Sequence, residues 1–118
     1  MWKYYNANPL NKITSDCTAR AISCATGKSW DYVYEHLSDI AQAKGTMMSD
    51  RDFIIEYLDE RYDRIPFVRG TVRDISDKYS DNIVLITMKD HITCSKYGVI
   101  YDSFDCLNKE AEFVWIVS

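Results

Sequence analysis

The order of the hydrophobic patterns along the chain is the feature that most limits its fold. Up to Tyr79 apolar residues recur at helical spacing, whereas beyond it they form β-branched and aromatic runs. The spacing predicts helices over residues 17–26, 30–44, 50–61 and 72–79, followed by strands over 82–88, 91–95, 99–104 and 112–117. Residues 1–15 are predicted to be an irregular arm. Helices followed by an antiparallel sheet of about four strands indicate an α+β fold, with the helices packed on the sheet.

Length and charge narrow the class of protein. The 118 residues predict one domain, 1–118, that can bury a core without a metal or disulfide. A net charge of −4 with scattered Lys and Arg argues against nucleic-acid binding. The longest apolar run, residues 83–86, is too short to cross a membrane, and no signal-like segment opens the sequence. We therefore expect a cytoplasmic protein with reduced cysteines and without membrane or nucleic-acid partners.

Residues 15–27 are the stretch in which local structure predicts chemistry. Asp16 is a typical N-cap and Gly27 a typical residue just past a helix end, so Cys17 is predicted at the first helical position. Unpaired backbone N–H groups and the helix dipole favour a thiolate there, and a thiolate is the nucleophilic form. The alternative is a buried structural thiol, which is the role expected for Cys24 two turns further on. Position alone favours neither alternative for Cys17.

His91 and Asp102 flank a predicted hairpin. If Lys96 and Tyr97 form a two-residue loop, His91 lies directly opposite Asp102; if Gly98 forms a bulge, the register moves by one and Asp102 becomes a diagonal neighbour. A carboxylate that orients a histidine beside Cys17 is the nucleophile, base and orienter of a thiol hydrolase. The alternative is a core histidine bonded to a sheet aspartate. Since the sequence has no Cys-x-x-Cys pair, we expect neither a metal nor a cofactor.

Several short motifs resemble those of small papain-like cysteine hydrolases. They are Asn8-Pro9, Asp16-Cys17, Arg20-Ala21, Ser29-Trp30, Val33, His91 at a strand start, and residues 101–105. The chain is similar in this respect to compact proteins of bacteria and phages akin to bacteriocin-processing peptidase domains. The resemblance implies a papain-like fold with Cys17 as nucleophile, His91 as general base and acid, and Asp102 as orienter. The oxyanion-hole glutamine of that family has no counterpart, so Asn11, or less favourably Asn8, is the candidate side-chain donor.

These observations lead to two hypotheses about function. The first is a cysteine-dependent hydrolase, a peptidase or an amide or thioester hydrolase, that acts on a protein or peptide through an acyl-enzyme. A transferase would use the same three residues. The second is a non-catalytic, papain-like interaction or inhibitor protein, possibly phage-encoded, that binds a host protein through its aromatic and acidic surface.

Overall fold

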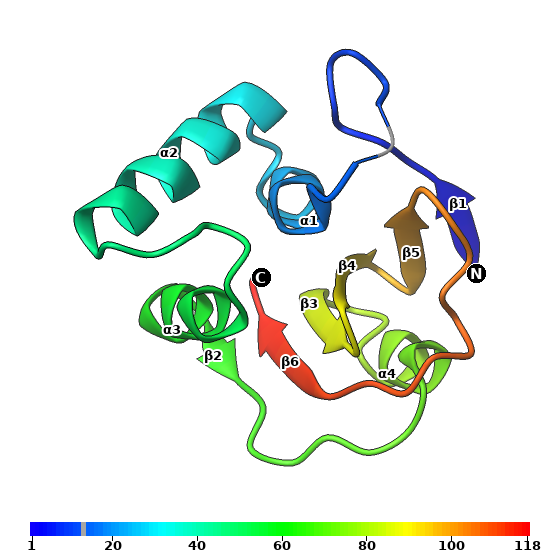
Figure 1. Cartoon of the computed structure of the whole chain (residues 1–118). Coiled ribbons are helices and arrows are strands. Elements are labelled where there is room, and N and C mark those ends of the chain that lie inside the picture. Colours follow the sequence, from blue (N-terminus) through cyan, green and yellow to red (C-terminus); the bar gives the residue numbers. More distant parts are fainter. Residues whose placement is uncertain (13) are drawn as a thin grey trace.

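The computed structural model, which describes residues 1–12 and 14–118, places a six-stranded sheet between helices (Figure 1). The described helices are α1 (Cys17–Thr26), α2 (Trp30–Ala43), α3 (Arg51–Arg61) and α4 (Val72–Lys78). The described strands are β1 (Trp2–Tyr4), β2 (Asp63–Arg64), β3 (Ile83–Met88), β4 (His91–Lys96), β5 (Val99–Asp102) and β6 (Phe113–Ile116). The predicted α+β class is confirmed. None of these helices is both long and apolar enough to cross a membrane.

The sheet is larger and more mixed than the sequence predicts. Its strand order is β1-β5-β4-β3-β6-β2. The four antiparallel strands that the sequence predicts correspond to β3, β4, β5 and β6. At one edge β1 pairs parallel to β5, and at the other β2 pairs with β6. The prediction of a four-stranded antiparallel sheet with an irregular arm over 1–15 is therefore wrong at both edges; of that arm, Ile13 lies outside the described residues. Strands of three and two residues are too short to show an alternating pattern.

Side chains of the central strands are buried on both faces of the sheet. Leu85 on β3 packs in a core formed with α1, α2 and α3, whereas its neighbours Val84 and Ile86 pack in a second core with α4. Figure 1 shows α4 on the side of the sheet opposite α1 and α2. Burial on both faces explains why the sequence of β3 is continuously apolar.

Helix α1 packs directly on β4 within the first of these cores. Its buried residues include Cys24, as predicted, and the helix ends at Gly27 with a left-handed φ of 75°. The packing brings the start of α1, which carries Cys17, close to the start of β4, which carries His91.

Candidate active site

Cys17 is the first residue of α1 and its side chain is half-buried. The predicted position at the helix start is thus confirmed. Asp16 precedes it, but the predicted capping by the Asp16 carboxylate is wrong, because that side chain makes no hydrogen bond to the first turn. Its Oδ1 accepts instead from Arg20 Nε at 2.9 Å and its Oδ2 from Trp30 Nε1 at 2.9 Å. The Asp16 carboxylate is thereby held away from the N–H groups beside Cys17.

His91 begins β4 and is hydrogen-bonded to Asp102 at the end of β5. The distance from His91 Nε2 to Asp102 Oδ2 is 2.7 Å, and both side chains are largely buried. With Nε2 engaged by the carboxylate, Nδ1 is the nitrogen left to exchange a proton with another group. The structure therefore brings together two residues that lie eleven positions apart in the sequence.

The hairpin between them has a register that differs from the predicted one. Cys94 lies opposite Tyr101 and Lys96 opposite Val99, so the loop is Tyr97-Gly98 rather than Lys96-Tyr97. Direct opposition of His91 and Asp102 is therefore wrong, and Asp102 is a diagonal neighbour. The shift is one residue on each strand, so both side chains stay on the same face of the sheet.

Tyr97 and Gly98 have φ angles of 51° and 82°, so both loop residues are left-handed. We expect Gly98→Ala to lower the free energy of unfolding by about 1 kcal/mol, since a Cβ is strained in this conformation. That Cβ would also lie 3.4 Å from the Ser80 Cβ. Tyr97→Asn, in which asparagine tolerates positive φ, is the control and should not destabilise the protein. Urea unfolding measures both; equal stability of Gly98→Ala and the unmodified protein would contradict this account of the turn.

The surroundings of Cys17 and His91 favour the ionised form of both side chains. Burial disfavours the charged imidazole, but the hydrogen bonds with Asp102 and Cys17 outweigh it and raise the pKa of His91 to about 9. Burial likewise opposes ionisation of Cys17, yet the hydrogen bond and charge of His91 lower the pKa of this thiol on balance. The Ile92 backbone N–H and the charge of Arg20 act in the same direction. These influences favour a thiolate beside an imidazolium over the neutral thiol and imidazole.

Asp102 stays ionised although its side chain is buried. Burial alone would raise the pKa of its carboxyl, but the hydrogen bonds that it accepts, first from His91, lower it. Its Oδ1 accepts from the Ser103 N–H at 2.7 Å, and Arg20 Nη1 lies 3.5 Å from the same oxygen. A buried carboxylate with partners at both oxygens can orient the imidazole without itself taking up a proton.

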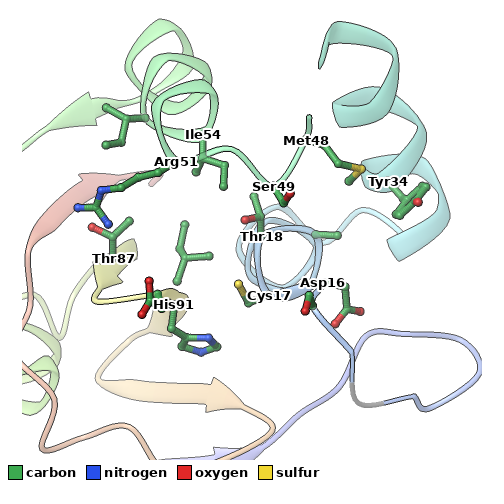
Figure 2. A pocket seen from close by; sticks show the side chains of 15 residues that line it. Asp16, Cys17, Thr18, Tyr34, Met48, Ser49, Arg51, Ile54, Thr87 and His91 are labelled. Atoms are coloured by element: carbon green, nitrogen blue, oxygen red, sulfur yellow. The ribbon is translucent and has the colours of Figure 1, made fainter. Parts of the chain in front are cut away.

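Cys17 and His91 lie side by side at one end of a pocket of about 460 Å³ (Figure 2). The pocket lies between the start of α1, the segment that leads into α3, the end of β3 and the start of β4. Its apolar wall includes Met48, Ile54, Ile55 and Ile92. A substrate group seated there would lie against the sulfur.

Backbone N–H groups in the first turn of α1 can donate hydrogen bonds beside Cys17. The first intrahelical bond runs from Arg20 N to Asp16 O at 3.0 Å, so the N–H groups of residues 17–19 precede it. The predicted side-chain donors lie elsewhere. Asn11 is exposed and does not line the pocket, and Asn8 is buried with its amide donating to Asp16 Oδ2 at 3.3 Å. The backbone N–H groups at the start of α1 thus lie beside Cys17, whereas Asn8 and Asn11 are not among the residues that line the pocket.

His91, Asp102 and Cys106 are the one group of possible metal ligands in the described part of the chain, with ligand atoms within 4.8 Å of one another. A 2.7 Å hydrogen bond already joins His91 to Asp102, which leaves no space for an ion between these two atoms. Burial raises the pKa of the Cys106 thiol to about 12, which disfavours its thiolate form in the metal-free protein. The group fits a hydrogen-bonded arrangement better than a metal centre.

Three features of the site escape sequence reasoning. Arg20 is buried, and it pairs with both Asp16 and Asp102. Its i,i+4 spacing from Asp16 is the one local signal of this role. The Phe104 ring packs on the His91 imidazole, with centroids 4.8 Å apart. The pocket wall from α3 depends on tertiary packing that no local pattern encodes.

No protein-family model, no curated protein and no solved structure matches this chain. The papain-like resemblance therefore stays a prediction based on short sequence motifs. What the chain does has to be argued from the geometry of Cys17, His91 and Asp102.

Proposed function

We propose that this protein is a cysteine-dependent hydrolase of papain-like type that cleaves an amide or thioester bond in a protein or peptide. The observation that carries the proposal is the 2.7 Å contact between His91 Nε2 and Asp102, with Cys17 on the other side of the imidazole and beside the pocket. Nucleophile, base and orienter in this order are the parts that acyl transfer through a thiol requires.

The reaction proceeds in two steps. The Cys17 thiolate attacks the substrate carbonyl carbon, and the resulting oxyanion accepts hydrogen bonds from N–H groups at the start of α1. The His91 imidazolium gives its Nδ1 proton to the leaving amine or thiolate as the bond to the carbonyl breaks, which leaves an acyl-Cys17 thioester. Neutral His91 then takes a proton from water, the hydroxide attacks the thioester, and the Cys17 thiolate and a carboxylic acid product are released. Asp102 remains ionised throughout.

The pocket supports a peptide or another acyl group with an apolar side chain as the substrate. Its wall is formed by Met48, Ile54 and Ile55, whose burial against an apolar group is favourable. Arg51 also lines the pocket and is paired with Glu112 at 3.2 Å. An acceptor other than water in the second step would make the same site a transferase.

Brief labelling with iodoacetamide at pH 7 should modify Cys17 before the other three cysteines. Cys24, Cys94 and Cys106 are at most 6% exposed, whereas Cys17 is half-buried and its pKa is lowered. Peptide mass spectrometry gives the order of labelling, and labelling of the urea-unfolded protein is the control in which all four should react alike. Labelling of Cys94 or Cys106 ahead of Cys17 in the folded protein would count against the proposal.

A further inference from the structure

Arg20 is a buried cation that contacts both sides of the candidate site. It lies one turn into α1 and is 8% exposed. Its Nε donates to Asp16 Oδ1 at 2.9 Å, while its Nη1 donates to Ser103 Oγ at 2.6 Å and lies 3.5 Å from Asp102 Oδ1. One guanidinium therefore joins the residue before the nucleophile to the residue that orients the base.

We propose that Arg20 is a positioning residue of the proposed hydrolase: it holds Asp16 and Asp102 in place and balances their charge, which favours the nucleophilic form of Cys17. This inference rests on the proposed function. Asp16 and Asp102 are 8% and 4% exposed, so their negative charges are poorly screened by water. Of the two cations near them, His91 balances one charge and Arg20 the other. Without Arg20, the excess negative charge would oppose formation of a thiolate at Cys17.

The geometry of Asp102 supports the positioning part of this role. Its Oδ2 accepts from His91, and its Oδ1 faces the Ser103 N–H and Arg20. Since the two oxygens have different partners, the carboxylate is fixed in rotation with Oδ2 toward the imidazole. A planar guanidinium that spans two carboxylates does this better than an ammonium group, which acts as a point charge.

Ionisable groups on several elements face Cys17 and His91. Those from the elements around the pocket and behind His91 are Asp16, Tyr34, Arg51, Asp90, Asp102 and Cys106. Arg51 and Asp90 are exposed, which weakens their effect through screening. All six remain in a protein changed only at Arg20, so the comparison isolates the guanidinium.

The test is the rate of Cys17 alkylation between pH 5 and 10, measured with circular dichroism as a check of folding. We expect Arg20→Gln to move the rise in rate to higher pH by roughly one unit, which slows alkylation at pH 6 about tenfold. Arg20→Lys keeps the charge and should stay within about threefold of the unmodified protein. Arg73→Gln is the control, because Arg73 is an exposed arginine that contacts Asn108, and its profile should not move.

Asp16→Asn provides a variant with the opposite expectation. It removes one of the two negative charges and should move the rise to lower pH; combined with Arg20→Gln, it should restore the original profile. If Arg20→Gln does not fold, Asp16→Asn alone decides, and an unmoved profile overturns the role of Arg20. A folded Arg20→Gln with the original profile overturns it as well, while the proposed function stands. An unmodified protein whose Cys17 titrates near the ordinary thiol pKa of about 8.5 would instead overturn the proposed function.

Discussion

Replacing His91 by alanine is expected to slow alkylation of Cys17 at pH 6 by one to two orders of magnitude, since a thiol with an ordinary pKa of about 8.5 is less than about 1% ionised there. The hydrogen bond and charge of His91 are the leading favourable influences on the pKa of Cys17, and both disappear in this variant. The rise in rate should then move to the pH at which an unperturbed thiol ionises. The measurement is the pH dependence of iodoacetamide modification at Cys17.

His36→Ala is the matched control for this variant. His36 is the other histidine of the chain; it lies on α2 and packs edge-on against Tyr57, with ring centroids 5.7 Å apart. Its removal should leave the reactivity of Cys17 unchanged. If His91→Ala has the original profile but a large loss of stability, His91 is a core histidine bonded to a sheet aspartate, and the thiol does not depend on it.

Asp102→Asn is expected to reduce turnover by roughly three to four orders of magnitude, because it removes the negative charge that orients and stabilises the imidazolium. The change keeps the size of the side chain but leaves His91 Nε2 without its anionic partner, and Arg20 with Asp16 alone. Cys17→Ala should abolish turnover, since no acyl-enzyme can form. The measurement is cleavage of a proteome-derived peptide library, with new amino termini identified by mass spectrometry.

Asp77→Asn is the control for the loss of a carboxylate, because Asp77 is an exposed residue of α4 on the other side of the sheet. It should cleave the library as the unmodified protein does. If the unmodified protein, Cys17→Ala and Asp102→Asn are all folded and none cleaves any peptide, while all three have the same effect on cells, the protein acts by binding a partner. That outcome would favour the interaction-protein hypothesis over the hydrolase.

Local signals in the sequence were sufficient for the placement of the candidate nucleophile. Gly27 ends α1 and Cys17 begins it as predicted, although Asp16 precedes the helix without capping it through its side chain. The predicted contact between His91 and Asp102 is present although the predicted register is wrong. A shift of one residue on each strand leaves both side chains on the same face of the sheet. The alternation of side chains along strands therefore predicts which residues share a face of the sheet. It is a poorer guide to which residues lie directly opposite each other on neighbouring strands.

The features that sequence reasoning missed depend on contacts between distant segments. Strand β1 has three residues and is defined by its pairing with β5 rather than by its own pattern. Arg20 is buried on α1 because Asp102 and Ser103, which are distant in the sequence, contact its guanidinium. Its link between two carboxylates therefore depends on tertiary packing. Asn11 precedes Cys17 closely in the sequence, yet its side chain is exposed in the described structure.

His91 is held as an imidazolium at neutral pH, and its charge and hydrogen bond favour the thiolate form of Cys17. The most direct test is an NMR titration of the His91 ring, labelled at its ring carbons, between pH 5 and 10. A pKa raised from 6.5 to about 9 means that the ring stays protonated through pH 7 and loses its proton only as the pH approaches 9. We expect a single transition near that pH, shifted downward in Cys17→Ala because the thiolate partner is gone. A His91 that titrates at or below pH 6.5 and is unaffected by Cys17→Ala would contradict the claim.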